Sequence, residues 1–248
     1  SIGIDVPQKC LIERANKYNY QVPATIMYTS GTTSRPRGAL LTHASYVFKG
    51  QLVSKALIMG REDRHLISLP LAHANAQYHF LATLISGASA VVTSRFSASR
   101  FLHQALQHGC TMATLFATPI RMLLANQRRP TDGQNNLRLV TFAQVLSELE
   151  IDEWHDRFGA PLIQIYGMTE TMGMVCANPI DHTKDNSTIG RPLPGYHLEI
   201  VDANGIEVSC ETPGHLVIRG RPGLEYMKNY YKNPEETARV IKNGKLWT

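Results

Sequence analysis

The amino-acid sequence predicts an α/β fold: a mostly parallel sheet layered with helices, followed by a small antiparallel β subdomain. The main observation is that strand-like apolar runs alternate with helical patterns from residue 24 to residue 167, the order typical of parallel sheets covered by helices. After residue 186 the chain changes to short alternating strands rich in glycine and proline. With 248 residues, 43% of them hydrophobic, the chain can bury a sizeable core.

The strands of the first part are short apolar runs that contain β-branched residues and end at turn-forming residues. They are expected over residues 23–30, 65–73, 88–94, 111–119, 137–144 and 161–167. Between them, apolar residues recur at helical spacing. Helices are expected over residues 42–57, 75–87, 98–109, 119–127 and 147–159. Thr42 is a candidate N-cap, Pro119 suits a first helical turn, and Gly87 and Gly109 suit helix ends.

The last part of the chain is predicted to be rich in strands. Asn204 and Gly205 separate two strand-like segments, residues 198–203 and 206–209, and this dipeptide is a strong hairpin signal. A short helix is expected over residues 233–242, with an asparagine cap followed by proline. We therefore expect an α/β portion over residues 1–185 and a β-rich subdomain over residues 186–248.

Composition narrows the possible partners. The net charge is +5 with the histidines neutral, and no run of five or six basic residues occurs, so a nucleic-acid partner is disfavoured and an anionic small molecule fits. The cysteines are far apart, which disfavours a zinc site and favours free thiols in the reducing cytoplasm; they are Cys10, Cys110, Cys176 and Cys210. No apolar run approaches the ~20 residues of a membrane span.

Residues 28–43 read YTSGTTSRPRGALLTH and place small polar residues beside positive charge at the end of a predicted strand. The small residues are Thr29, Ser30, Gly31, Thr32 and Thr33. Such loops cradle phosphate oxygens through hydroxyls and backbone N–H groups, and Arg35 and Arg37 can add charge-assisted bonds. The loop is not a Walker A motif, because Pro36 and Arg37 stand where glycine and lysine are needed. From composition alone, a polar turn between strand and helix is an equally good interpretation.

Residues 164–171 read QIYGMTET and place the Thr169 hydroxyl beside the Glu170 carboxylate just after a strand. Open sheets bind ligands at the carboxyl ends of their strands. A carboxylate there could hold Mg²⁺, which prefers oxygen ligands and substrate phosphates. The alternative is a helix start, with Thr169 as cap and Glu170 in the first turn. Taken alone, the segment leaves both interpretations open.

The order of these residues closely resembles the adenylate-forming superfamily, which includes acyl-CoA synthetases, peptide-synthetase adenylation domains and firefly-type luciferases. YTSGTTSRPRG is similar to its phosphate loop, TSGTTGxPKG, with Ser34 replacing glycine and Arg37 replacing lysine. YGMTE resembles its next signature, YGxTE. LPLAHAN at 69–75, IGRPLPG at 189–195, GHLVIRG at 214–220 and MKNYYKNPEETA at 227–238 resemble further motifs in the same order. The TSRP variant looks like the crotonobetaine/carnitine–CoA ligase branch.

The resemblance implies ATP-dependent activation of a small carboxylic acid to an acyl-adenylate, followed by transfer to the thiol of CoA or of a carrier protein. ATP, Mg²⁺ and CoA are the implied cofactors. The implied nucleotide-binding residues are Thr29, Ser30, Gly31, Thr32, Thr33, Arg37, Gln164, Tyr166, Gly167 and Thr169. Glu170 is the implied metal ligand. The implied catalytic residues are Thr169, Glu170 and Arg37.

Two further groups of residues follow from the resemblance. The expected acyl-pocket residues are His73, Asn75, Met168, Gly173 and Met174. Residues 143–145 occupy the stretch that is glycine-rich in the superfamily and passes over adenine.

The resemblance runs from about residue 23 to the end of the chain. Since superfamily members are longer at both ends, we expect this chain to be a fragment of the large N-terminal domain. The start of that domain and the mobile C-terminal domain, with its catalytic lysine, are expected to be missing. Two rival functions stay open. One is a non-catalytic nucleotide- or acyl-adenylate-binding module, and the other is an adenylating enzyme that serves a carrier protein.

Overall fold

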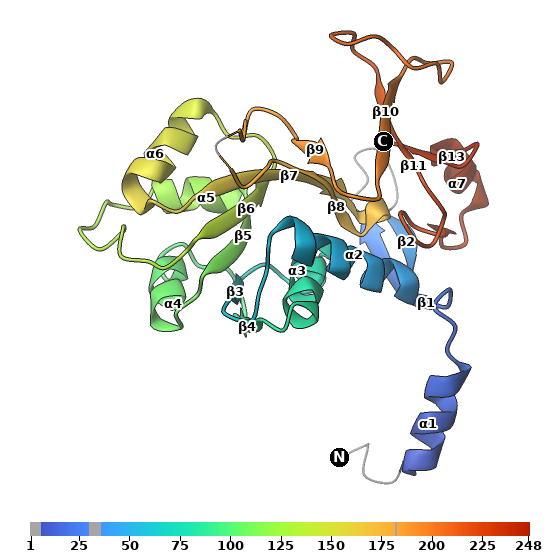
Figure 1. The fold of residues 1–248 in the computed structure, drawn as a ribbon, viewed down its shortest axis with the longest axis horizontal. Coiled ribbons are helices and arrows are strands. Elements are labelled where there is room, and N and C mark those ends of the chain that lie inside the picture. The colour runs from blue at the N-terminus through green and yellow to red at the C-terminus, as the bar shows by residue number, and fades with distance from the viewer. Residues whose placement is uncertain (1–5, 30–35, 182) are drawn as a thin grey trace.

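A seven-stranded sheet forms the centre of the protein in a computed structural model that describes residues 6–29, 36–181 and 183–248 (Figure 1). Its strand order is β4-β3-β5-β6-β7-β8-β9. The strands are β3 (Arg64–Ile67), β4 (Ser89–Val92), β5 (Met112–Phe116), β6 (Leu139–Ala143), β7 (Leu162–Met168), β8 (Gly173–Ala177) and β9 (Arg191–Pro192). Strands β3 to β7 pair in parallel, and β8 and β9 extend one end of the sheet as antiparallel strands. The predicted, mostly parallel sheet is confirmed.

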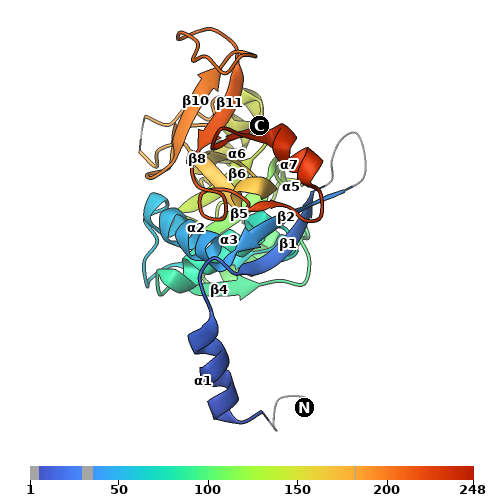
Figure 2. The same ribbon diagram turned by 90° about the vertical axis from the view of Figure 1, so that its right-hand side faces the viewer.

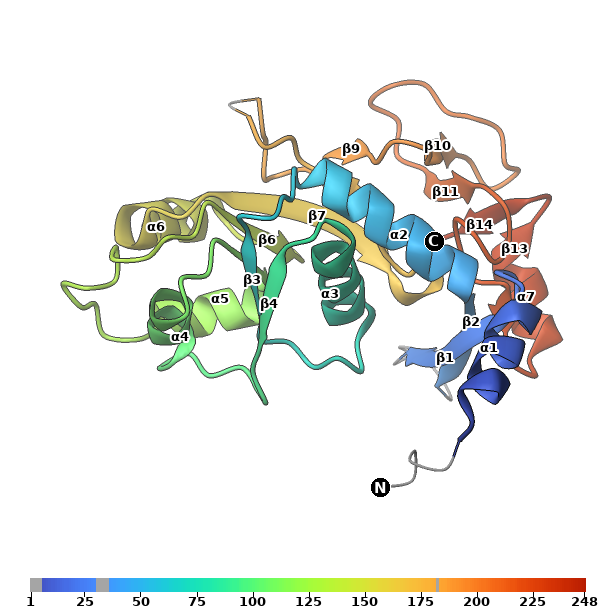
Figure 3. The same ribbon diagram turned by 60° about the horizontal axis from the view of Figure 1, so that its bottom comes forward.

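Helices cover both faces of this sheet. They are α2 (His43–Ala56), α3 (Ala74–Ile85), α4 (Phe101–Gln107), α5 (Ala117–Leu124) and α6 (Glu148–Phe158). Figure 3 shows α2 and α3 on one side of the sheet and α4, α5 and α6 on the other. Because strand side chains alternate between faces, Met112 and Leu139 join the core under α2 and α3, whereas Ala113 and Val140 join the core under α5 and α6.

Two smaller antiparallel sheets flank the large one. In the first, β1 (Pro23–Thr29), β2 (Arg37–Thr42) and β12 (Asn229–Tyr230) pair in the order β1-β2-β12. The second has the order β10-β11-β14-β13, with β10 (His197–Val201), β11 (His215–Arg219), β13 (Ile241–Lys242) and β14 (Lys245–Trp247). Helix α7 (Pro234–Val240) lies beside β2 in Figures 1 and 2. The predicted small antiparallel sheet is therefore present.

Most predicted boundaries agree with the structure. Thr42 caps α2 in a reciprocal capping box, Ser147 does the same for α6, and Asn233 caps α7. The strand predicted over residues 65–73 ends at Ile67, and the following residues turn into α3. Strand β2 was not predicted, and it forms by pairing with β1 and β12 on either side.

The predicted hairpin at Asn204 and Gly205 is a tight turn closed by a single bridge between Val201 and Glu207. Strand β10 pairs along its whole length with β11 instead.

The predicted division at residue 185 is crossed by two strand pairs. Strand β9 joins the large sheet, and β12 pairs with β2. The division into two portions stays a prediction. Helix α1 (Gln8–Lys17) has none of its described residues buried and lies apart from the body in Figures 1 and 2. Among the described residues, no helix combines the length and apolar composition needed to cross a membrane.

Candidate active site

The site is organised around a tight corner between β7 and β8. Strand β7 ends in a single 3₁₀ turn, Thr169–Thr171, and the chain reverses into β8. A Cβ atom on Gly167 would lie 2.1 Å from the carbonyl oxygen of Gly173. Gly173 has φ +94°, and its own Cβ would lie 2.1 Å from the ring of Tyr78. Both glycines are therefore required by close packing, and Gly173 also by its left-handed backbone.

A cavity of about 140 Å³ lies at this corner, on the side of the sheet covered by α3. It is lined by His73, Ala74, Asn75, Tyr78, Phe116, Ala143, Ile165, Gly167, Met168, Thr169, Gly173 and Met174. All the predicted acyl-pocket residues are in this lining, together with the predicted nucleotide-binding residues Gly167 and Thr169. The structure thus brings together residues from α3, β5, β6, β7 and β8. Their roles stay predictions.

The floor of the cavity is a hydrogen-bonded polar cluster. Asn75 is buried; its Oδ1 accepts from the Thr114 hydroxyl at 2.9 Å, and its Nδ2 donates to the Tyr78 hydroxyl at 3.3 Å. Buried polar groups that are satisfied in this way fix side-chain orientation. Asn75 is therefore held at a defined angle beneath the cavity.

Two histidines lie next to this floor with their rings 5.1 Å apart. His79 Nδ1 lies 2.9 Å from the Asn75 carbonyl oxygen, and its Nε2 lies 3.1 Å from the Thr141 hydroxyl. Since a carbonyl only accepts, Nδ1 carries the proton and Nε2 accepts from Thr141. Burial lowers the pKa of His79 to about 4, and burial followed by the neighbouring His79 lowers the pKa of His65 well below its usual range. Both rings are thus neutral at pH 7.

Glu170 lies directly after the cavity residue Thr169 and is 5% exposed. Its Oε1 accepts a hydrogen bond from the Tyr230 hydroxyl at 2.5 Å, and its backbone oxygen accepts from Met227 N at 2.5 Å. Burial, followed by this bond to Glu170, raises the pKa of the Tyr230 phenol, so Tyr230 donates at neutral pH. Within the described residues, Glu170 Oε2 has no hydrogen-bond partner.

This geometry fits a magnesium ligand. One carboxylate oxygen is held by a donor while the other is left for a cation, and Mg²⁺ is commonly bound by one or two carboxylates plus substrate phosphates. Among the described residues, no cluster of three or more His, Cys, Asp or Glu side chains could hold a metal. A metal at this place would therefore depend on Glu170 together with phosphate oxygens.

The predicted phosphate loop connects β1 to β2. Thr29 and Arg37 are directly paired across these strands, and the Thr29 hydroxyl donates weakly to the Arg37 carbonyl oxygen at 3.5 Å. Ser30, Gly31, Thr32 and Thr33 lie outside the described residues. The half-buried Arg37 guanidinium pairs with Glu236 of α7 at 3.0 Å and lies 5.1 Å from the centre of the Tyr230 ring.

Two predicted adenine contacts, Gln164 and Tyr166, are not among the described residues that line the cavity. Gln164 is buried, and its Oε1 has no hydrogen-bond partner among the described residues. Tyr166 is half-buried beside an irregularity in the pairing of β7 with β8. The structure therefore places both on β7, next to the cavity residues Ile165 and Gly167 but outside the lining itself.

The stretch expected to pass over adenine has a backbone feature of its own. Gln144 has φ +76°, a left-handed conformation that favours glycine. Ala143, on one side, lines the cavity, and Val145, on the other, is 76% exposed. A glutamine here occupies the backbone conformation that suits the glycine-rich stretch of the superfamily.

A buried lysine, Lys49 of α2, stands behind the cavity. Its ammonium donates to the carbonyl oxygen of the cavity residue Met174 and to the Tyr196 hydroxyl, the latter at 2.9 Å. Burial lowers the pKa of Lys49 well below its usual range. The first bond ties α2 to β8 at the cavity wall, and the second ties α2 to the segment just before β10.

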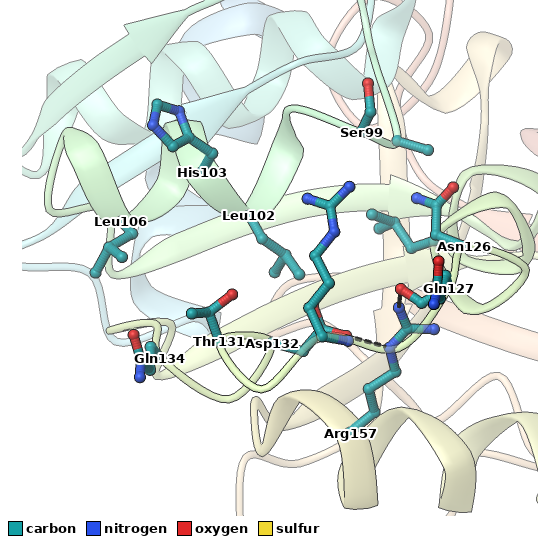
Figure 4. A pocket seen from close by; sticks show the side chains of 13 residues that line it. Ser99, Leu102, His103, Leu106, Asn126, Gln127, Thr131, Asp132, Gln134 and Arg157 are labelled. Atoms are coloured by element: carbon teal, nitrogen blue, oxygen red, sulfur yellow. Dashed lines mark hydrogen bonds and ion pairs between the residues drawn. The ribbon is translucent and has the colours of Figure 1, made fainter.

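Figure 4 shows a second cavity, of about 210 Å³, between α4, α5 and the loop that follows α5. Its buried charged groups are paired: Arg157 Nε donates to Asp132 at 2.6 Å, and its other nitrogens donate to the carbonyl oxygens of Leu124 and Gln127. None of the predicted site residues lines it. Its contacts anchor the loop to α6, and we assign it a structural role.

Sequence reasoning gave no role to Tyr230, Glu236, Tyr78 or Lys49. Tyr230 and Glu236 lie within the stretch MKNYYKNPEETA, so the motif was noted but its contact with Glu170 was not. That contact joins residues 60 positions apart, and a sequence pattern carries no signal for such pairing. Tyr78 and Lys49 each lie on a helix, where periodicity predicts burial but not the hydrogen-bond partner.

The family and several relatives were identified by comparison with known proteins. The family model described as AMP-binding enzyme matches residues 10–231. A crotonobetaine/carnitine–CoA ligase from Salmonella agona (strain SL483) is 35% identical over 221 residues, which are 88% of this chain and 43% of the ligase.

Solved structures agree with the sequence comparison. An o-succinylbenzoate coenzyme A synthetase from Bacillus subtilis in complex with AMP has a TM-score of 0.81 at 28% identity, covering 93% of this chain and 47% of that one. The same synthetase in complex with ATP and magnesium ion has a TM-score of 0.79 at 29% identity, with the same coverage.

The chain spans less than half the length of these relatives. The resemblance to adenylate-forming enzymes, and the likeness to the crotonobetaine/carnitine–CoA ligase branch, are confirmed at the level of sequence and fold. The chain belongs to the family of AMP-binding enzymes.

Proposed function

We propose that the protein is an acid–thiol ligase that activates a carboxylic acid with ATP and transfers the acyl group to CoA. The observation that carries this proposal is that the predicted acyl-pocket residues line one cavity, and that this lining includes Thr169, the neighbour of Glu170. The proposed acid cavity thus lies at the turn that carries Glu170, the proposed metal ligand. The names of the relatives, a CoA ligase and a coenzyme A synthetase, support the same class of reaction.

The reaction has two steps. An oxygen of the acid attacks the α-phosphorus of ATP, the new C–O–P bond forms, and the bond to pyrophosphate breaks. The CoA sulfur then attacks the acyl carbon, the acyl–oxygen bond breaks, AMP leaves, and the thiol proton is released. Mg²⁺, when bound, neutralises phosphate charge. Glu170 would hold it, and Thr169 would contact the α-phosphate.

The cavity limits the acid that fits. Its volume of about 140 Å³ is close to that of an engineered apolar cavity, about 150 Å³, that binds benzene. None of the described lining residues is Asp, Glu, Lys or Arg. We therefore propose an acid whose tail is uncharged.

The substitution Glu170→Gln tests the proposal. Isothermal titration of the protein should show micromolar binding of a non-hydrolysable acyl-AMP analogue. Glu170→Gln should weaken ATP·Mg²⁺ by about 10-fold or more and leave the analogue nearly unchanged, because the analogue carries no β- or γ-phosphate. Glu225→Gln, which removes a buried carboxylate paired with Arg221 at 3.1 Å, is the matched control and should bind both ligands normally.

Activity assays separate the alternatives. Acid-dependent pyrophosphate exchange supports the ligase, whereas nucleotide binding without exchange supports the non-catalytic module. The pairing of Arg37 with Glu236 favours that second candidate, since the guanidinium is engaged within the protein. Acyl transfer to a carrier protein but not to CoA would reassign the acceptor. Failure of both ATP·Mg²⁺ and the analogue to bind would contradict the proposal.

A further inference from the structure

Four charged or polar side chains from distant parts of the chain meet beside the cavity. They are Arg37 of β2, Glu170 of the 3₁₀ turn, Tyr230 of β12 and Glu236 of α7. Tyr230 is central: its hydroxyl donates to Glu170 at 2.5 Å, and its ring centre lies 5.1 Å from the Arg37 guanidinium carbon. Arg37 in turn pairs with Glu236 at 3.0 Å.

Tyr230 is held beside Glu170 by burial and by contacts of its backbone. It is 2% exposed, and its backbone pairs with Ala39 of β2. Its N–H donates to the Thr237 hydroxyl at 2.9 Å, which links it to the first turns of α7. A phenol fixed by sheet pairing, by a helix and by burial presents its hydroxyl in one direction.

This direction determines how Glu170 can present its carboxylate. Oε1 is occupied by the Tyr230 donor, so the carboxylate cannot rotate freely. Oε2, which has no partner within the described residues, is the oxygen left for a cation. Hydrogen-bonded partners of this kind orient metal ligands, and their removal costs about 10–100-fold in metal affinity.

We infer that Tyr230 is the positioning residue for Glu170: it fixes one carboxylate oxygen so that the other meets the nucleotide-bound Mg²⁺. The inference rests on the proposed function and adds a residue to which none of the comparisons assigns a role. Tyr230 does not touch the reacting atoms. It acts only through Glu170, and this route is what an experiment can measure.

The test compares Tyr230→Phe with Tyr226→Phe in isothermal titrations. Tyr226 is a buried tyrosine of the same segment whose hydroxyl donates to the Gly220 carbonyl oxygen at 3.1 Å, away from Glu170. Tyr230→Phe should weaken ATP binding in the presence of Mg²⁺ by about 10-fold or more and raise the Mg²⁺ concentration needed for half-maximal binding. It should leave AMP binding without Mg²⁺ unchanged. Tyr226→Phe should alter neither ligand.

A double-mutant cycle tests whether Tyr230 acts through Glu170. In a protein that already carries Glu170→Gln, adding Tyr230→Phe should produce no further loss of ATP·Mg²⁺ affinity, because non-additivity marks residues that act through one another. If Tyr230→Phe does not fold, 3-fluorotyrosine at position 230 keeps both ring and hydroxyl. Its ¹⁹F signal should then shift on binding ATP·Mg²⁺ but not AMP alone.

Three results would overturn the inference while leaving the proposed function intact. They are wild-type ATP·Mg²⁺ affinity in Tyr230→Phe, equal losses for ATP·Mg²⁺ and AMP, and additive losses in the cycle. If the fluorotyrosine is used, a ¹⁹F signal that ATP·Mg²⁺ does not move has the same meaning. By contrast, a wild-type protein that binds no ATP·Mg²⁺ contradicts the proposed function itself, and the inference falls with it.

Discussion

At the scale of single residues, the cavity rests on side chains that are polar but uncharged. Asn75 and Thr114 belong to the floor, and Thr141 lies next to it with two neutral histidines, His65 and His79. Such networks are rigid when every donor and acceptor is paired. His65 Nε2 is the exception, with no hydrogen-bond partner in the described part of the chain. Burial therefore keeps the two histidines neutral, and the stability of this region should fall when acid protonates them.

The first prediction concerns this sensitivity. The pKa of His79 is about 4 in the folded protein and about 6.5 in an unfolded chain. Between these values the unfolded state binds more protons, so the free energy of unfolding falls as pH decreases from 6.5 toward 4, by about 3 kcal/mol from His79 alone. In His79→Asn, which has no titratable group, this part should disappear. Urea denaturation of wild type and His79→Asn from pH 7 to pH 4 measures this difference. An equal fall in the free energy of unfolding in both proteins would contradict the prediction.

The sequence predicted which residues gather at the cavity, whereas the roles of these residues and of the nucleotide-binding residues stay predictions. His73, Asn75 and Met174 lie at the ends of strands or the starts of helices, where a parallel sheet gathers side chains at one edge. Gln164 and Tyr166 lie on the same strand as Gly167, yet they are not in the cavity lining. Successive side chains of a strand point to opposite faces, so Gln164 and Tyr166 face away from the lining residue Ile165. A single sequence does not show on which face of the strand a cavity lies.

At the scale of elements, Thr42 joins two parts of the fold at once. Its hydroxyl accepts from Ser45 N at 3.1 Å as the cap of α2, and donates to the Gly223 carbonyl oxygen at 2.5 Å. The side chain is fully buried. The cap was predictable from the sequence, but the bond to Gly223 spans 181 positions and was not.

The second prediction follows from these two hydrogen bonds of Thr42. Thr42→Ala removes a helix cap, which typically costs about 1 kcal/mol, and leaves a buried carbonyl unpaired, which costs about 1–3 kcal/mol more. We expect a loss of about 2–4 kcal/mol in the free energy of unfolding. Thr42→Ser keeps the hydroxyl and should lose much less. Chemical denaturation of the two variants beside wild type tests this, and equal losses would show that the methyl group, not the hydroxyl, matters.

The elements that were predicted well are those with local signals. Helices α2 and α7 carry their capping residues in the expected places, and α6 has a capping box at Ser147. Strand β2 carries none, and it is defined by its neighbours β1 and β12. Short strands that depend on distant partners are the part of this fold that pattern reasoning could not reach.

At the scale of the whole molecule, the candidate site is shared between the beginning, middle and end of the chain. Arg37 and Glu236 are 199 positions apart, and Glu170 and Tyr230 are 60 apart. Nucleotide binding at Glu170 should therefore also stabilise the segment that carries Tyr230 and α7, even where it makes no contact with the ligand.

The third prediction is a pattern of hydrogen exchange. Saturating ATP·Mg²⁺ should slow amide exchange in residues 225–240, because a ligand that binds only the folded state stabilises the segments its binding orders. Local opening of the loop at residues 127–136, which lines the second cavity, should be unaffected. Mass spectrometry of exchanged peptides distinguishes the two regions. Protection confined to residues 164–174 would contradict the shared site.

The pairing of β12 with β2 also depends on the order in which the residues are synthesised. Translation delivers residues in order at about 5–20 per second, so Tyr230, 60 positions after Glu170, emerges roughly 3–12 seconds later. By the time Met174 has left the ribosome, every described residue that lines the cavity at the β7–β8 corner has been synthesised. The nascent chain then carries a Glu170 carboxylate whose hydrogen-bond donor does not yet exist. The residues of the proposed acid cavity are thus synthesised before the residue that orients the proposed metal ligand, and a ribosome stalled between them would carry the first without the second.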